Sequence, residues 1–518
     1  RLVTAIGRSD AEAVAICLLF SYLEPAHERA IAERLRAALP GLHVSVSHEV
    51  LAQFREYERC STTVIDAYLS PLLGRYLGRL VAAAAERGLP EPLVMKSSGG
   101  VAPAGEAASA GAQAVLSGPA GGAVGAGLVA RLSGDGNVLG FDMGGTSCDV
   151  CVVEGGAVRR TDSRRIGGRV IQLPMVDVHT VGAGGGSVAW ADEGGALRVG
   201  PRSAGAMPGP ASYGRGGTEP TVTDANLLLG YLDADSALAG GVTLDPEAAR
   251  RAIGGLGAEL GLDELATAEG IVRVADQEMV RALRVVTVER GIDPRGFALV
   301  PFGGAGPMHA AAIARELGVE RLLCPRASGV LSALGLLASE RRRDTARTVM
   351  LRGGDLTRER IAAEVSALRD AISDGLDEAE TRAGYDLRYR GQAFELAIDG
   401  CDRPDPAELA ERFAAEHERR YGYRDDEAEV ELVNVRLALA VPGASLSPVA
   451  ADPGALEQGS RRARFDGEWR QAAVLRGEPE AGREAEGPCV FELPEATLVL
   501  PPGWSARVDA HGTIACVR

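Results

Sequence analysis

Residues 138–153 combine the side chains and the spacing that could do chemistry in this chain. Two apolar runs are separated by the sequence Asp-x-Gly-Gly-Thr, which predicts a β-hairpin with a short polar turn. Gly144 and Gly145 lack the Cβ atoms that would keep an anion away from the backbone N–H groups, and Thr146 adds a hydroxyl donor. The turn is therefore predicted to bind phosphate, and ordinary turn chemistry is the alternative.

Two carboxylates bracket this turn. Asp142 precedes the glycines and Asp149 follows them. Carboxylate oxygens bind Mg²⁺ directly or through its waters, so Asp142 is a candidate metal ligand beside the predicted phosphate site.

A second glycine motif lies at residues 297–310. An apolar strand is followed by Gly303, Gly304 and Gly306 and then by the start of a helix. Ligands of open α/β sheets bind where strand ends meet such loops. A lone Gly-Gly-x-Gly is weak evidence, but the order of the two motifs is typical of the nucleotide cleft of the actin-like ATPase and sugar-kinase superfamily.

The composition excludes several classes of protein. A length of 518 residues favours two or three domains, and the net charge of −16 argues against a nucleic-acid surface. No apolar stretch is long enough to span a membrane, and the first residues are not expected to act as a signal peptide. Eight cysteines without paired spacing favour a reducing environment, so we expect a cytoplasmic protein.

The basic residues are almost all arginine. Lys96 is the single lysine, so a cationic phosphate clamp in this chain would use arginine or Lys96. The run Arg341–Arg343 is predicted to be a solvated linker between domains.

Periodicity predicts the remaining elements. Residues 167–217, rich in glycine and proline, are expected to form ordered loops that line a cleft. Thr223 and Asp224 are expected to cap a short helix, and Asp245 with Pro246 to open another. The other expected strands are 13–19, 43–47, 93–95, 429–440 and 489–500. The other expected helices are 27–39, 62–87, 267–290, 357–383 and 405–421, and a further strand-helix unit is expected over 321–337.

These elements predict an α/β protein in three parts. Residues 1–136 would form the remainder of a first lobe, and 137–340 a second lobe with both glycine motifs. Residues 341–518, with charged helices and separate strands, would form a C-terminal α+β domain.

With both glycine motifs in place, the chain resembles the A subunit of the hydantoinase/oxoprolinase family, a group that includes N-methylhydantoinases, 5-oxoprolinases and the β subunit of acetone carboxylase. The resemblance runs nearly from end to end. Besides the two glycine motifs, the matching stretches are 47–50, 55–59, 117–122, 181–187, 200–210, 221–226, 388–392 and 417–423.

The resemblance implies an actin-like ATPase fold of two lobes, plus the C-terminal domain. Relatives carry another Asp-x-Gly-Gly-Thr turn near their amino terminus, so this chain is expected to lack the start of its first lobe. The implied activity is ATP-dependent hydrolysis of a cyclic amide such as a hydantoin or 5-oxoproline. ATP and Mg²⁺ are the implied cofactors, and a hydantoinase B-type subunit is the implied partner.

Site residues follow from the same resemblance. Asp142, Asp149 and Asp224 would be catalytic, with Asp142 also holding the metal. The residues implied to contact ATP are Gly144, Gly145, Thr146, Gly184, Gly185, Gly303, Gly304 and Gly306. His309 follows the second glycine motif, and its ring could either stack near a nucleotide or pack between helices.

The chain departs from the family at a few polar positions. Cys148 replaces a usual threonine, Lys96–Ser98 replaces Gln-Ser-Asn, and Ser212 stands where cysteine is common. Ser212 argues against a cysteine-dependent step at that position. Two other functions stay open: the β subunit of an ATP-dependent ketone carboxylase, and a non-catalytic nucleotide-binding module.

Overall fold

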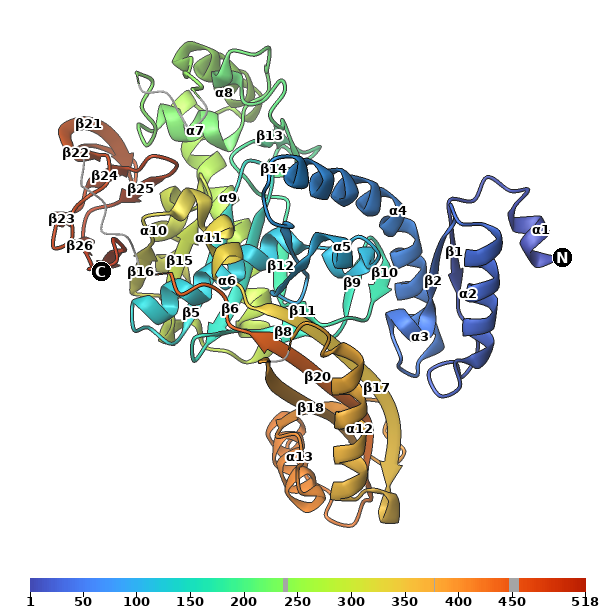
Figure 1. Cartoon of the computed structure of the whole chain (residues 1–518). Coiled ribbons are helices and arrows are strands. Elements are labelled where there is room, and N and C mark those ends of the chain that lie inside the picture. The colour runs from blue at the N-terminus through green and yellow to red at the C-terminus, as the bar shows by residue number, and fades with distance from the viewer. Residues whose placement is uncertain (236–240, 377, 447–455) are drawn as a thin grey trace. The chain divides into compact units, whose positions relative to one another are not determined.

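The structure, a computed structural model, describes residues 1–235, 241–376, 378–446 and 456–518 and divides into two compact units (Figure 1). Unit 1 consists of Arg1–Ala120, Arg160–Val176 and Ser339–Ala444, and unit 2 of Gly121–Arg159, Asp177–Ala338 and Ser445–Arg518. Each unit thus combines segments that are distant in the sequence. The predicted domain boundaries at 136 and 340 stay a prediction.

Unit 1 contains a six-stranded sheet in the order β19-β18-β20-β17-β4-β3. Helices α12 (Arg358–Ile372) and α13 (Pro406–Tyr421) pack on it, and their residues Ile361, Val365, Leu409 and Phe413 share one apolar core with the strands. The strands are β3 (Leu93–Met95), β4 (Val101–Pro103), β17 (Arg341–Arg352), β18 (Glu380–Tyr389), β19 (Leu396–Gly400) and β20 (Val430–Val441).

The first part of unit 1 follows the predicted alternation. Strands β1 (Ala13–Ile16) and β2 (His43–Val46) pair in parallel, with helix α2 (Ala26–Ala38) between them in sequence. The long helix α4 (Glu56–Glu86) begins earlier than predicted, at Glu56 instead of residue 62. Shorter elements of this unit are α1 (Leu2–Ile6), α3 (Ser47–Val50), α5 (Ala104–Ala107), β8 (Arg160–Thr161), β9 (Arg164–Ile166), β10 (Arg169–Ile171) and β11 (Met175–Val176).

The prediction that Arg341–Arg343 form a solvated linker is wrong, because these residues begin strand β17. Arg342 is buried, and its guanidinium donates to Oε1 of Glu340 at 3.0 Å and to Oδ1 of Asp344 at 2.8 Å. Burial alone would raise the pKa of Asp344, but the nearby Arg342 lowers it below its usual value. Arg342 therefore compensates the charge of Asp344 within the sheet.

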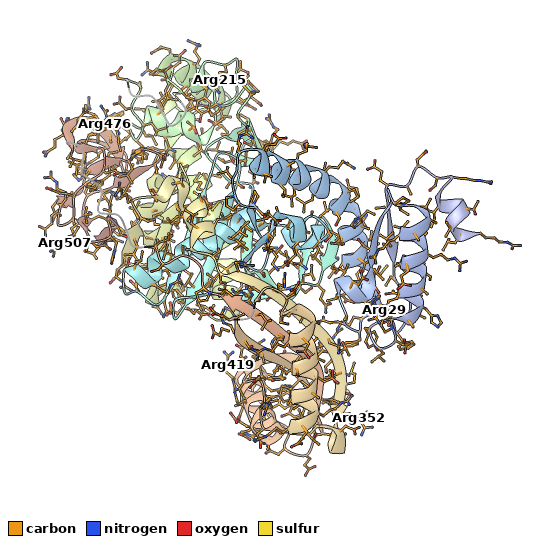
Figure 2. The ribbon with its side chains drawn as sticks, viewed as in Figure 1. Arg29, Arg215, Arg352, Arg419, Arg476 and Arg507 are labelled. Atoms are coloured by element: carbon orange, nitrogen blue, oxygen red, sulfur yellow. The ribbon has the colours of Figure 1, made fainter. Side chains whose placement is uncertain are left out.

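The arginines labelled in Figure 2 have the opposite environment. All six are exposed: Arg29, Arg215, Arg352, Arg419, Arg476 and Arg507. Removing such a side chain costs little, whereas Arg342 is held between two carboxylates.

We expect Arg342→Ala to lower the free energy of unfolding by about 3 kcal/mol, because Asp344 would keep its buried charge without its partner. The matched control is Arg341→Ala, one residue earlier on the exposed side of β17, with an expected change within about 0.5 kcal/mol. Urea denaturation followed by circular dichroism measures both. Equal effects of the two substitutions would contradict the buried ion pair.

Unit 2 is built on a nine-stranded sheet in the order β12-β6-β5-β15-β16-β27-β26-β23, with β7 beside β6. Its centre is parallel, because β15 runs parallel to both β5 and β16, and its two sides are antiparallel. The strands are β5 (Val138–Met143), β6 (Cys148–Glu154), β7 (Ala157–Val158), β12 (Val178–Val181), β15 (Ala298–Phe302), β16 (Arg321–Cys324), β23 (Glu484–Glu486), β26 (Ser505–Val508) and β27 (Ile514–Val517).

Helices of unit 2 share a large apolar core with this sheet. The amphipathic helix predicted at 267–290 is α9 (Glu264–Val286), and Ile271, Met279 and Leu283 on its inner face are fully buried. The other helices are α6 (Ser117–Leu132), α7 (Val222–Leu228), α8 (Pro246–Leu260), α10 (Gly306–Leu317) and α11 (Leu331–Ala338). No helix within the described ranges has both the length and the apolar character that a membrane span requires.

Three predicted elements differ from the structure. The helix expected over 357–383 ends at Ile372, and its last residues belong to strand β18. The strand expected over 489–500 is a hairpin of β24 (Cys489–Glu492) and β25 (Thr497–Leu500), which continues a small sheet with β21 (Glu457–Phe465) and β22 (Glu468–Arg476). The region 167–217, expected to be loops, contains short strands, among them β13 (Ser187–Ala191) and β14 (Leu197–Ser203).

Candidate functional site

The predicted hairpin is confirmed at the centre of unit 2. Strands β5 and β6 pair antiparallel, and Asp142 lies opposite Asp149 at the end of the ladder. Phe141 and Val150 are fully buried, whereas Gly145 and Thr146 at the bend are exposed. Burial of the strands therefore fixes a bend that is open to ligand.

The backbone N–H groups at this bend are free. Gly144 donates to the carbonyl of Ser147 at 3.1 Å and closes the turn. The N–H groups of Gly145, Thr146 and Ser147 donate to no acceptor in the part of the chain that the structure describes. Consecutive unpaired amides of this kind form a concave site for an anion.

The two carboxylates of the hairpin affect each other. Burial, and then the charge of Asp149, raise the pKa of Asp142 to about 6. Asp149 accepts a hydrogen bond from the hydroxyl of Thr180 on β12, and Ser332 approaches Asp142 at 3.5 Å. A cation bound between these carboxylates would relieve their repulsion.

The second glycine motif lies directly beside the hairpin. Strand β15 runs parallel to β5, with Phe302 opposite Asp142, and Ala305 donates its N–H to the carbonyl of Met143 at 3.0 Å. Gly303 has a φ of +76°. A Cβ atom at Gly303 would collide with the Asp142 carboxylate and lie 2.5 Å from the Met143 carbonyl oxygen. The structure thus brings the two predicted motifs together.

The loop at 184–186 contacts the turn of the hairpin through backbone hydrogen bonds. Gly185 and Gly186 donate their N–H groups to the carbonyls of Gly144 and Gly145, at 3.0 and 2.7 Å. A Cβ atom at Gly184 would lie 2.7 Å from the backbone nitrogen of Thr146. These glycines are buried and their amides are occupied, so their contact with a nucleotide stays a prediction.

Asp224 lies in the first turn of α7, not at its cap. The cap is Thr221, and Asp224 completes a capping box with it, so the predicted cap at Thr223 is wrong. The Asp224 carboxylate is fully buried and also accepts from the backbone N–H of Ser212 at 2.7 Å. Thr223 in turn donates to the carbonyl of Gly185 at 2.8 Å. These bonds give Asp224 a structural role, and a catalytic role stays a prediction.

The two carboxylates at the hairpin suit Mg²⁺, which takes few ligands from the protein, better than they suit a metal ion that is bound by protein side chains alone. Among the described residues there is no group of three or more His, Cys, Asp or Glu side chains that could hold a metal ion. Mg²⁺ is commonly bound by one or two carboxylates, with phosphate oxygens and waters completing its octahedron. Asp142 and Asp149 beside three free amides fit that pattern.

Comparison with known proteins decides the family. Residues 59–345 match the family model described as hydantoinase/oxoprolinase, and residues 437–516 match the model of the hydantoinase/oxoprolinase C-terminal domain. The chain belongs to the hydantoinase/oxoprolinase family.

Its relatives in this family include proteins of known activity. The chain is 39% identical to caprolactamase subunit alpha of Pseudomonas jessenii, over 97% of this chain and 76% of that protein. The crystal structure of ATP-dependent caprolactamase from the same organism has a TM-score of 0.85 at 37% identity, covering 98% of this chain and 77% of that one. The predicted family is therefore confirmed.

Two further members are more distant. The chain is 32% identical to 5-oxoprolinase 1 of Arabidopsis thaliana, over 97% of this chain and 42% of that longer protein. The nucleotide-free structure of acetone carboxylase has a TM-score of 0.79 at 26% identity, covering 99% of this chain and 77% of that one. The fold is thus that of the hydantoinase/oxoprolinase family.

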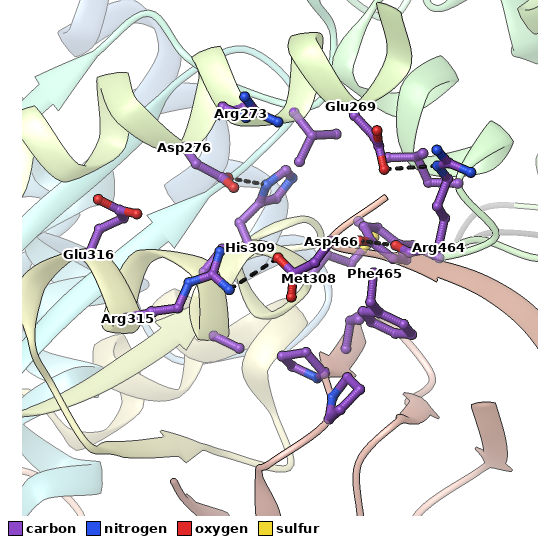
Figure 3. A pocket seen from close by; sticks show the side chains of 18 of the residues that line it. Glu269, Arg273, Asp276, Met308, His309, Arg315, Glu316, Arg464, Phe465 and Asp466 are labelled. Carbon is purple, nitrogen blue, oxygen red and sulfur yellow. Dashed lines mark hydrogen bonds and ion pairs between the residues drawn. The ribbon is translucent and has the colours of Figure 1, made fainter. Parts of the chain in front are cut away.

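In this family member, His309 lies in a different part of unit 2 from the hairpin bend. It belongs to a cavity of about 430 Å³ between α9, α10 and strands near the end of the chain (Figure 3). Its Nδ1 is 2.7 Å from Oδ1 of Asp276, and its Nε2 is 3.2 Å from Nδ2 of Asn226. Both ring nitrogens lie within hydrogen-bond distance of side chains on neighbouring helices, so the structure favours a role of His309 in helix packing.

Sequence reasoning missed one part of the site. Ser147 completes the row of free amides, and its position directly after Gly-Gly-Thr was an available signal. Thr180 and Ser332 reach the carboxylates from segments distant in the sequence, so no local pattern pointed to them.

Proposed function

We propose that this chain is the ATP-using subunit of an enzyme that hydrolyses a cyclic amide, such as a hydantoin or 5-oxoproline. The observation that carries the proposal is the row of free amides at Gly145, Thr146 and Ser147 beside the carboxylates of Asp142 and Asp149. Similarity to ATP-dependent caprolactamase and to 5-oxoprolinase supports ATP use and lactam hydrolysis. We further propose the two-lobe architecture of actin-like ATPases, which the adjacent glycine motifs support.

Each part of the site has a proposed role. The amides at the hairpin bend hold the terminal phosphates of ATP, with the Thr146 hydroxyl as a further donor. The Gly303–Gly306 loop, with Gly304 exposed, lies beside the adenosine. Gly184 and Gly185 hold the hairpin in place, and Asp224 positions the neighbouring loop through Ser212.

The proposed reaction begins with phosphoryl transfer to the amide oxygen of the ring. Phosphorylation makes the ring carbon an electrophile that water can attack at neutral pH. The C–N bond of the resulting tetrahedral intermediate then breaks, the ring nitrogen leaves as a protonated amine, and a second water hydrolyses the remaining acyl phosphate to carboxylate and phosphate. Asp142 and Asp149 would hold Mg²⁺, with Asp142 as its principal protein ligand. When bound, this ion would offset the charge that develops on the phosphates.

A partner subunit of the hydantoinase B type is part of the proposal. The name of the relative caprolactamase subunit alpha supports assembly with other subunits. Water attack and ring opening would then need both subunits, so each alone is expected to be inactive toward the ring.

The proposal is tested by coexpressing the full-length gene with the gene of its B-type neighbour and measuring phosphate release across a series of lactams. We expect ATP cleavage to rise at least tenfold with one lactam, and ring-opened product to form in step with phosphate, by analogy with coupled transfer enzymes. Nucleotide binding without stimulation by any lactam would instead favour a non-catalytic binding module.

A second candidate is the β subunit of an ATP-dependent ketone carboxylase. The TM-score of 0.79 to acetone carboxylase favours it, because that enzyme shares the fold over almost the whole chain. Acetone with bicarbonate in the same phosphate-release assay separates the candidates. Stimulation by the ketone without stimulation by lactams would overturn the first proposal.

A further inference from the structure

Unit 1 contains a small polar cavity that none of the roles above uses. Its volume is about 110 Å³, which corresponds to roughly four water molecules at the density of the liquid. It is lined from several segments of unit 1, among them the loop between β3 and β4, the residues after α3, the segment before β11, and β17. This size suits a five-membered ring with one small substituent.

Three carboxamides line this cavity: Gln53, Gln113 and Gln172. Gln53 is buried, and its Oε1 accepts a hydrogen bond from Nε2 of Gln172 at 2.6 Å. No further hydrogen bond of these side-chain amides connects them to a described residue around the cavity. The cavity therefore offers both amide N–H donors and carbonyl acceptors to a ligand.

Lys96 is the one cation of the cavity that forms no ion pair with a carboxylate among the described residues. Its side chain is buried, with 5% of the residue exposed, yet it forms neither a hydrogen bond nor an ion pair. Asp162 is paired with Arg436, and Oδ1 of Asp344 is paired with Arg342, whereas Oδ2 of Asp344 has no hydrogen-bond partner among the described residues. Burial is the main cause that lowers the pKa of Lys96 from its usual value, and the charges of Asp344 and Glu106 oppose it only in part.

A buried hydroxyl lies beside this lysine. Ser98 is 4% exposed, and its Oγ has no hydrogen-bond partner in the described part of the chain. The loop is fixed from both sides, because Ser97 donates to the carbonyls of Gln113 and Val115 and Arg160 donates to the carbonyl of Ser98. Buried polar groups without partners are rare in folded proteins and indicate a missing ligand or water.

We propose that this cavity binds the ring substrate, a small cyclic amide that carries a carboxylate, of the 5-oxoproline type. Ring closure holds the N–H and C=O of a lactam on the same edge, and the edge of a glutamine carboxamide pairs with it through two hydrogen bonds. Lys96 pairs with the carboxylate, and Ser98 donates its hydroxyl to the same group. The inference rests on the proposed function, because the ligand is the substrate of that function.

The single lysine of the sequence gives a direct test that needs no turnover. The chain is treated with a small acylating reagent, and the peptide that contains Lys96 is quantified by mass spectrometry. We expect 5-oxoproline to slow acylation of Lys96 at least about fivefold, 2-pyrrolidinone to slow it less, and open-chain glutamate to have no effect. Unchanged acylation in saturating 5-oxoproline overturns the inference.

A second measurement uses the assembled enzyme with its partner. Gln172→Leu is expected to raise the KM for the lactam about tenfold with little change in kcat, whereas the exposed Gln458→Leu changes neither. Lys96→Gln is expected to abolish the preference for 5-oxoproline over 2-pyrrolidinone. If a lactam drives ATP cleavage but both cavity variants keep wild-type constants, the cavity assignment fails and the proposed function stands. If no lactam drives ATP cleavage, the proposed function fails, and the acylation result alone decides whether the cavity binds the ring.

Discussion

Asp142→Asn is expected to stabilise the free protein at neutral pH and to lower its ATP cleavage strongly. Burial and the charge of Asp149 raise the pKa of Asp142 to about 6, whereas an aspartate of the unfolded chain titrates near 3.9. The folded state therefore binds the proton of the Asp142 carboxyl more tightly than the unfolded chain does. The stability that this protonation contributes is fully present below about pH 4 and is lost as the pH rises through about 6.

The size of the effect follows from the shift. Two pKa units correspond to about 3 kcal/mol, and the partial exposure of Asp142 reduces this to about 2 kcal/mol. Asparagine has nearly the same shape and carries no charge, so Asp142→Asn should be more stable than the wild type at pH 7.5 and equal to it at pH 4. Thermal unfolding at the two pH values measures the difference.

Activity is expected to change in the opposite direction. Loss of the proposed metal ligand should lower ATP cleavage about 10²- to 10³-fold, and Mg²⁺ with ATP should raise the melting temperature of the wild type but not that of the variant. Ser332→Ala is the matched control, because Ser332 contacts Asp142 only at 3.5 Å. A less stable Asp142→Asn at pH 7.5, or one with wild-type activity, would contradict the proposed site.

Gly303→Ala is expected to disrupt the site, whereas Gly304→Ala should be tolerated. Gly303 has a φ of +76°, and an added Cβ would meet Asp142 and the Met143 carbonyl. Strain and overpacking together should cost about 2–4 kcal/mol. At Gly304 the nearest atom to a Cβ is the carbonyl oxygen of Glu495 at 3.7 Å, an ordinary contact, so a change within about 0.5 kcal/mol is expected.

The same pair of variants reports on nucleotide binding. Gly303→Ala should weaken ATP binding at least about tenfold, because the added Cβ would displace both the Asp142 carboxylate and the turn of the hairpin. Calorimetric titration with ATP and Mg²⁺ on folded protein at low temperature separates this loss from unfolding. Equal affinities of the two variants would show that the loop and the hairpin do not form one site.

The local parts of the site could be predicted from the sequence. The hairpin and the strand-loop-helix at 298–317 depend on neighbouring residues, so their apolar runs and glycines were sufficient. The contact between Gly303 and Asp142 depends on the pairing of β15 with β5, which joins segments distant in sequence. The amides of the 184–186 loop likewise bond to a turn about 40 residues earlier, and no local pattern indicates that use.

Other differences have identifiable physical causes. Glu340, Arg342 and Asp344 place a charge at every second residue across the start of β17, and this period of two was the signal against a linker. The helix expected to continue to residue 383 stops because Ala383 pairs with Leu437 in the sheet of unit 1. The polar cavity could not be predicted because residues from seven separate segments of the chain build it.

The position of β27 has a consequence for how the protein is made. Strand β16 ends at Cys324, but its neighbour β27 begins only at Ile514, and β16 lies beside the strand that carries the second glycine motif. At typical ribosomal speeds the intervening chain takes roughly 10 to 40 seconds to emerge. During that interval an apolar strand edge is open to wrong pairing. The sheet of unit 2 should therefore be completed only after β27 has been synthesised.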